Sequence, residues 1–109
     1  MADRARPDPE PVELRRLRRR IDALDRRIVR LLNDRAELAR EVGRAKARDG
    51  GRAVRDAERE REVLLRVSMA NAGPTPQADL LAVYRRLFAV ARGLETRDRR
   101  RATRDAGDA

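Results

Sequence analysis

The sequence has 109 residues, of which 43% are charged and 40% hydrophobic, with a single Tyr and a single Phe. It is therefore expected to form one small domain with few bulky groups for a core. The chain contains no Cys and no His, which excludes disulfides, thiol nucleophiles, imidazole acid–base catalysis and the usual zinc ligands. Any chemistry must use carboxylates, cations and positioning, and no cofactor is expected.

The net charge of +9 arises from 28 basic and 19 acidic residues that are interspersed along the chain. Such mixing indicates solvated helix faces, so the charge does not require a nucleic-acid partner. The N-terminal residues lack the apolar stretch of a signal peptide, and no run approaches the ~18 apolar residues of a membrane span. We expect a cytoplasmic protein with neither a membrane segment nor a bound nucleic acid.

Residues 1–11 are predicted to be a disordered leader because they are polar and rich in proline. A heptad pattern follows, in which apolar residues recur at alternating steps of three and four. Its positions are Leu14, Leu17, Ile21, Leu24, Ile28, Leu31, Leu38, Val42 and Ala45. Arg35 interrupts this apolar seam at a position where a leucine is expected.

The seam predicts one helix from about Val12 to Ala47. At ~1.5 Å per residue this helix would be ~50 Å long, which exceeds the width of a folded part of about 85 residues. The helix must therefore pack against another chain. Asp49, Gly50 and Gly51 are expected to end it, because glycine readily adopts the left-handed conformation of a helix terminus.

Two further helices are predicted. One runs from about Val54 to Asn71, and Asp56 and Glu60 lie on the line of its apolar stripe. The other begins near Pro76, after the Gly73-Pro74 break. Its apolar positions are Leu80, Tyr84, Leu87, Ala91 and Leu94. Residues 97–109 are rich in arginine and are predicted to be a frayed helix end or a disordered tail.

Arg35 and Lys46 are eleven residues apart, which is three helical turns, so both point along one face and could hold a small dianion. Lys46 is the only lysine in the chain. The alternative is a pair of long side chains that cover apolar surface with their charged ends in water. Asp56 and Glu60 have a similar alternative, since carboxylates in a first helical turn interact favourably with the helix dipole.

Arg18 precedes Arg35 by seventeen residues, or ~25 Å along the helix, so the two cannot hold one small ligand within a single chain. An antiparallel helix of a partner chain could bring an Arg18 side chain to Arg35. The remaining arginines of the first helix are expected to form its solvated outer face.

Four motifs occur in an order and at spacings that resemble the all-helical, type II chorismate mutases, over about residues 12–96. They are L-R-x-x-I-D-x-L-D at 17–25, L-L-x-x-R-x-E-L-A at 31–39, V-G-x-A-K at 42–46 and V-R-D-x-x-R-E at 54–60. The resemblance implies an intertwined homodimer of three-helix chains. It also implies that chorismate rearranges to prephenate, a reaction that needs neither a nucleophile nor proton transfer.

The resemblance implies a role for each matching residue. Arg35 and the partner chain's Arg18 would bind the substrate carboxylates, and Lys46 would contact the ether oxygen and a carboxylate. Glu60 and the region of Asp56 would hold the ring hydroxyl. Arg59 would orient these groups. Catalysis would come from holding the substrate in its folded, reactive shape and from fixed positive charge near the ether oxygen.

The third helix departs from the family pattern at two positions. Counted from Phe88, the family's usual Ser falls at Glu95 and its usual Gln at Arg99. Arg99 could still donate to the ether oxygen, whereas Glu95 would repel a substrate carboxylate unless a cation is paired with it. Glu95 and Arg99 are both predicted to belong to the substrate site.

Other functions remain open from the sequence. A mutase for 4-amino-4-deoxychorismate would suit Asp56 and Glu60, which could bind an amine at the ring position, and an isochorismate-pyruvate lyase is a more distant variant. A different class is an arginine-rich helical dimer that binds nucleic acid, or a weak mutase homologue that acts through a partner enzyme.

Overall fold

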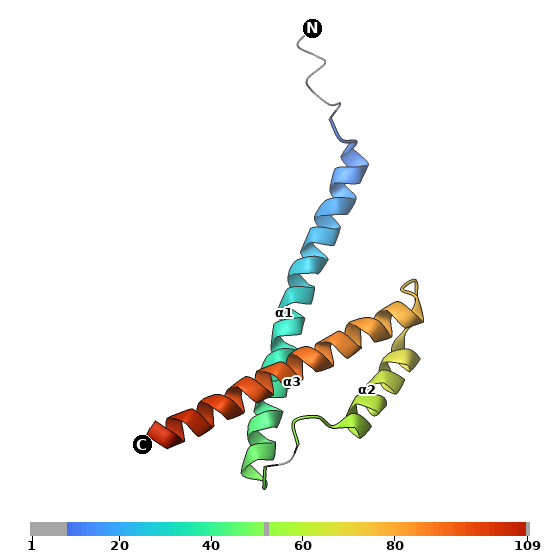
Figure 1. Cartoon of the computed structure of the whole chain (residues 1–109). Helices are drawn as coiled ribbons and strands as arrows, with labels where there is room; N and C mark the ends of the chain where they lie inside the picture. Colours follow the sequence, from blue (N-terminus) through green and yellow to red (C-terminus); the bar gives the residue numbers. More distant parts are fainter. Residues whose placement is uncertain (1–8, 52, 109) are drawn as a thin grey trace. The chain divides into compact units, whose positions relative to one another are not determined.

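The computed structural model describes residues 9–51 and 53–108, and every regular element within these ranges is a helix. The helices are α1 (Val12–Arg48), α2 (Ala57–Ala70) and α3 (Gln77–Asp108) (Figure 1). The prediction of an all-α chain with three helices and a very long first helix is confirmed. Residues 1–8 of the predicted leader lie outside the described residues. No helix in the described ranges is long and apolar enough to cross a membrane.

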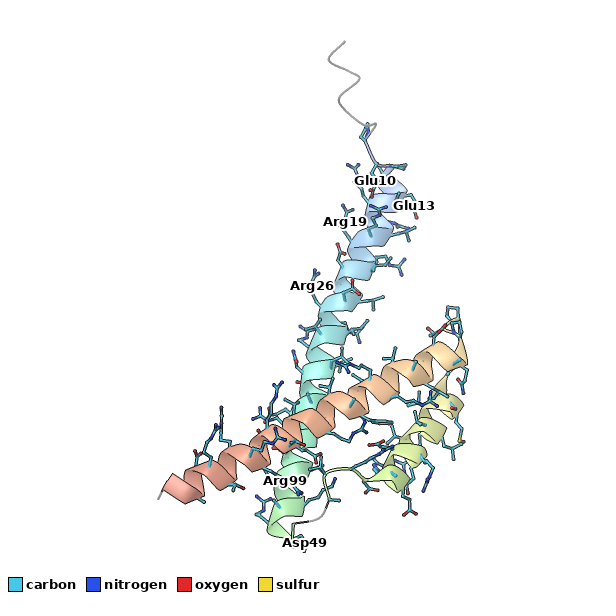
Figure 2. The ribbon with its side chains drawn as sticks, viewed as in Figure 1. Glu10, Glu13, Arg19, Arg26, Asp49 and Arg99 are labelled. Atoms are coloured by element: carbon cyan, nitrogen blue, oxygen red, sulfur yellow. The ribbon has the colours of Figure 1, made fainter. Side chains whose placement is uncertain are left out.

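The chain divides into two compact units, residues 1–34 and residues 35–109. In the first unit, helix α1 carries its charged side chains outward, as Figure 2 shows for Glu13, Arg19 and Arg26. The apolar seam is also open to solvent in the single chain, with its residues between 39% and 61% exposed. These seam residues are Leu14, Leu17, Ile21, Leu24, Ile28 and Leu31. The first unit thus presents an uncovered row of leucine and isoleucine side chains.

Helix α1 ends as its glycines predict. Gly50 has φ +94° and Gly51 has φ +72°, which only glycine adopts without strain. The Gly51 N–H donates to the Lys46 carbonyl at 3.1 Å, so the last turn closes with a six-residue hydrogen bond. The backbone of Lys46 is therefore fixed by the turn that ends the helix.

Helix α2 begins three residues later than predicted, at Ala57 instead of Val54. Asp56 has extended backbone angles, and its side chain accepts a hydrogen bond from the Arg59 N–H at 2.9 Å. This is the geometry of a helix N-cap, which the apolar spacing alone does not reveal. Asp56 thus lies in front of the helix and not within its first turn.

Helices α2 and α3 form a hairpin whose arms run in opposite directions (Figure 1). The Asn71 amide donates to the Thr75 carbonyl at 3.0 Å and to the Gln77 side chain at 2.9 Å, while its oxygen accepts from the Gly73 N–H at 3.0 Å. One side chain therefore organises the connection. Helix α3 then continues to Asp108, through residues 97–108 that the sequence pattern assigned to a tail.

The second unit has a thin core. Phe88 is the one buried hydrophobic side chain among the described residues, at 6% exposed, and Glu95 is equally buried. Glu95 fits against Gly43 of α1: a Cβ atom added at Gly43 would lie 2.8 Å from the Glu95 Cγ. The absence of a side chain at Gly43 is what lets the second half of α1 approach α3 this closely.

We expect Gly43→Ala to destabilise the protein by ~1 kcal/mol, because the overpacking cost of ~1–3 kcal/mol exceeds the ~0.5–1 kcal/mol that alanine gains over glycine in a helix. A Glu95→Ala substitution removes the side-chain atoms that Gly43→Ala would meet. In that background Gly43→Ala should instead stabilise the protein by the ~0.5–1 kcal/mol that alanine gains over glycine in a helix. Urea denaturation of the unsubstituted protein, the two single variants and the double variant, all at one protein concentration, measures both effects.

Gly93→Ala is the matched control, because nothing lies within 4 Å of a Cβ added at this α3 position. It should stabilise in both backgrounds by ~0.5–1 kcal/mol. If Gly43→Ala stabilised equally with and without Glu95, the proposed contact would be wrong.

Candidate functional site

A cavity of about 300 Å³ lies within the second unit, which is at the lower end of the ~300–1,000 Å³ typical of ligand sites. All three helices and the loop before α2 contribute to its wall. The lining residues are Arg35, Leu38, Ala39, Val42, Lys46, Val54, Asp56, Arg59, Glu60, Val63, Phe88, Arg92 and Glu95. Four cations and three carboxylates thus surround a cavity whose remaining wall is apolar.

Arg35 is held over aromatic rings. Its guanidinium carbon lies 5.7 Å from the centre of the Tyr84 ring and 5.6 Å from that of Phe88. The two rings themselves meet edge to face at 6.4 Å. A cation over such rings is attracted by their negative faces without being neutralised. Among the described residues no carboxylate pairs with Arg35, so its charge stays available to a ligand.

Lys46 is mostly buried, with 19% of its side chain exposed. Its ammonium donates to the Val54 carbonyl at 3.3 Å and lies 3.9 Å from a Glu95 carboxylate oxygen. The first contact ties the end of α1 to the loop that leads into α2. The second places a negative charge beside the cation, as a ligand carboxylate would.

Glu60 is held by two arginines. Arg92 of α3 donates to one carboxylate oxygen at 2.6 Å, and the Arg55 guanidinium lies 3.7 Å from the other. Arg59, the neighbour of Glu60, lines the cavity and points its guanidinium towards Glu62 at 3.3 Å. Glu60 is thus a fixed, charge-compensated acceptor in the cavity wall.

Glu95 is buried, and one of its carboxylate oxygens has no hydrogen-bond partner in the described part of the chain. Burial raises the pKa of this carboxyl, because removal from water disfavours the charged form. The positive charges of Lys46 and Arg99 oppose this rise in pKa, and the charge of Asp98 adds to it. Burial therefore disfavours the ionised form of Glu95.

The structure brings together six of the eight residues that the sequence predicted for the site, namely Arg35, Lys46, Asp56, Arg59, Glu60 and Glu95. Arg99 instead lines a second cavity of about 90 Å³, to which Gly43 and Glu95 also contribute. It follows Glu95 by one turn, beyond the contact of α3 with Gly43. The role of Arg99 in substrate binding therefore stays a prediction, and Glu95 is the residue that the two cavities share.

Arg18 belongs to the first unit, where its guanidinium lies 2.7 Å from a Glu10 carboxylate oxygen and 62% of its side chain is exposed. Arg92 was not predicted, although it lies four residues after Phe88 and three before Glu95, and therefore on their helix face. The hydrophobic pattern of α3 does not indicate Arg92, because such a pattern includes only apolar residues.

Glu95 and Asp98 should give opposite dependences of stability on pH. A carboxyl with a raised pKa favours the folded state below the ordinary glutamate value near 4.5, and this contribution is lost as the pH rises through the folded-state pKa. The free energy of unfolding of the unsubstituted protein, relative to that of Glu95→Gln, should therefore fall as the pH is raised from about 4 to about 7.

Asp98→Asn is the comparison with the opposite sign. The hydrogen bond from Arg40, at 3.0 Å, lowers the pKa of Asp98, so its contribution is present above the ordinary aspartate value and is lost as the pH falls. Urea denaturation across a pH series at constant protein concentration measures both. Curves of the same sign for the two variants would contradict these assignments.

Comparison with known proteins identifies relatives over most of the chain. The family Chorismate mutase type II matches residues 17–96. A bifunctional chorismate mutase/prephenate dehydratase of Aquifex aeolicus is 37% identical over 87 residues, which are 76% of this chain and 24% of that protein. One of Neisseria gonorrhoeae is 37% identical over 78 residues, with 72% and 21% covered. The chain thus spans about a quarter of the length of these curated relatives.

A solved structure shows the same fold over a comparable length. The structure of chorismate mutase (form II) from Thermus thermophilus has a TM-score of 0.74 and 32% sequence identity, and the match covers 78% of this chain and 96% of that one. Sequence and fold therefore agree, and this chain belongs to the chorismate mutase type II family.

Proposed function

We propose that this protein is a chorismate mutase, an isomerase that converts chorismate to prephenate. The observation that carries the proposal is the gathering of Arg35, Lys46 and Glu60 around one cavity of ligand size. These are residues to which the family resemblance assigns substrate contacts. The match of the family over residues 17–96 supports the same function.

The proposed reaction is intramolecular. The carbon–oxygen bond of the enol ether breaks as a carbon–carbon bond forms at the ring, so atoms and electrons balance without an acid, a base or a co-reactant. A chain without His or Cys can therefore catalyse it. What the protein must supply is a folded substrate conformer and positive charge where negative charge grows on the ether oxygen.

The cavity offers groups for each task. Arg35, on its aromatic support, would bind a substrate carboxylate, and the Lys46 ammonium would face the ether oxygen and a carboxylate. Glu60, which Arg92 holds in place, would accept a hydrogen bond from the ring hydroxyl. The apolar side chains of Val42 and Val63 would contact the ring and exclude water.

An ionised Glu95 would weaken the binding of a negatively charged substrate, and protonation of Glu95 would lessen this effect. Its ionised carboxylate beside Lys46 would repel a bound carboxylate, whereas its protonated form would not. Because burial raises the pKa of Glu95, the protonated form is more populated than in an exposed glutamate. Binding of a dianion would favour protonation further.

We also propose that the protein acts as a homodimer. The lining residues carry four cations and three carboxylates, a net charge of +1, against the two negative charges of chorismate. Arg18 of a second copy would supply a further cation, as the family resemblance implies. The exposed apolar seam of α1 supports the same arrangement, since a second copy would cover it. The cytoplasmic location stays a prediction.

The direct test of the activity is to incubate the purified protein with chorismate. The reaction is monitored by the loss of chorismate absorbance, and the product is identified by proton NMR. Arg35→Ala and Lys46→Ala should each lower kcat/KM by about 10²–10³-fold, because each removes a fixed charge from a partly dry site. Arg48→Ala is the matched control: it removes an exposed cation of the same helix that does not line the cavity.

Circular dichroism and sedimentation should show that the inactive variants keep the fold and the oligomeric state of the unsubstituted protein. No formation of prephenate by that protein would reject the function. Full activity of Arg35→Ala or Lys46→Ala would reject the site.

The shared site has its own test, in which two inactive variants are mixed. If Arg18 acts in the partner's pocket, a heterodimer of Arg18→Ala and Lys46→Ala chains holds one pocket with both cations. Random exchange of subunits should then restore roughly a quarter of the unsubstituted activity. The variants are unfolded and refolded together, and activity is compared with that of each refolded alone. A mixture that stays inactive would argue for pockets built from one chain.

A further inference from the structure

The three carboxylates of the cavity all have partners. Asp56 accepts the Arg59 N–H at 2.9 Å, and Glu95 lies 3.9 Å from the Lys46 ammonium. Glu60 is the most strongly compensated, with Arg92 at 2.6 Å from one oxygen and Arg55 at 3.7 Å from the other. Glu60 is therefore the carboxylate of the described cavity wall with two guanidinium groups beside it, whereas the partner of Asp56 is a neutral N–H group.

Arg92 differs from Arg55 in its position. Arg92 lines the cavity with 31% of its side chain exposed, whereas Arg55 is not among the lining residues and is 66% exposed. Water screens the charge of Arg55 more effectively than that of Arg92. A guanidinium also keeps its proton throughout the accessible pH range, so burial cannot neutralise Arg92. The cavity thus contains a permanent cation directly beside its main hydrogen-bond acceptor.

This arrangement treats a hydroxyl and an amine differently. A carboxylate has about four acceptor positions, and the bond from Arg92 leaves others free for a ligand O–H. An ammonium group could use the same positions, but it would also lie within a few ångströms of the Arg92 charge, where like charges repel strongly. The attraction of Glu60 for the ammonium would be offset by the repulsion from Arg92.

We propose that Arg92 is a specificity-determining residue that favours a substrate with a hydroxyl at the ring position over an analogue with an amine there. The inference rests on the proposed function and deepens it. It separates chorismate from 4-amino-4-deoxychorismate, which Asp56 and Glu60 by themselves would not do. Arg92 also positions Glu60, because its hydrogen bond fixes the carboxylate from the side of α3.

The experiment compares kcat/KM for chorismate and for 4-amino-4-deoxychorismate. The unsubstituted protein should prefer chorismate. Arg92→Met keeps the apolar stem and removes the charge. It should lower the ratio of kcat/KM for chorismate to kcat/KM for 4-amino-4-deoxychorismate by on the order of tenfold or more. Arg92→Lys keeps a cation beside Glu60 and should retain most of the preference. The comparison of Met with Lys separates charge from packing.

Two controls use other arginines. Arg104→Met removes the same charge from an exposed position of α3 outside the cavity, and should leave the ratio unchanged. Arg55→Met removes the more exposed partner of Glu60, and should change the ratio less than Arg92→Met does. Circular dichroism of each variant checks the fold.

Three results would overturn the inference. In the first, the unsubstituted protein turns over chorismate without preferring it to 4-amino-4-deoxychorismate. In the second, Arg92→Met lowers the two kcat/KM values equally, and in the third, Arg92→Lys loses as much of the preference as Arg92→Met does. The first of these requires no variant to fold, and it rejects the role of Arg92 while leaving the mutase function intact. No turnover of either compound would reject the mutase function and this inference with it.

Discussion

The contact between Gly43 of α1 and the buried Glu95 of α3 is the interaction on which the site depends. An added Cβ at Gly43 would come within 2.8 Å of Glu95, so the spacing of the two helices is set by the missing side chain. At this spacing Lys46, one turn beyond Gly43, comes within 3.9 Å of the Glu95 carboxylate. Arg35, two turns before Gly43, comes over the rings of Tyr84 and Phe88. One close approach thus positions the two α1 cations that line the cavity.

Charge compensation then determines what the cavity can bind. In a site of low dielectric constant an unpaired carboxylate is costly, and each carboxylate here has a cation or an N–H group beside it. The exception on the cationic side is Arg35, which rests on aromatic rings instead of an anion. A site in which Glu60 and Glu95 each lie beside a cation, while Arg35 lies beside no anion of the described residues, is suited to an anionic ligand. That preference is consistent with a dicarboxylate substrate and with the family to which the chain belongs.

The scarcity of buried apolar groups connects the site to assembly. Phe88 is the one hydrophobic residue that is buried among the described residues, and the seam of α1 is exposed in the isolated chain. A chain with so small a core gains stability when a second copy covers the seam, because buried apolar area is the main source of folding free energy. In the proposed homodimer the seam would therefore serve both stability and catalysis, since it would also present Arg18 to the neighbouring pocket.

Local signals in the sequence were enough to predict the three helices and the turn that ends α1, because the heptad spacing and the Gly50-Gly51 pair need no partner. A broken seam, helical spacing and family motifs also identified Arg35, Lys46, Asp56, Glu60 and Glu95 as residues of interest. The N-cap role of Asp56 was missed, since a polar residue before a helix resembles one within its first turn. The contact of Arg92 with Glu60 and the separate cavity of Arg99 emerged from the tertiary structure alone. Those contacts depend on how closely α1, α2 and α3 approach one another, and a spacing along one helix does not contain that distance.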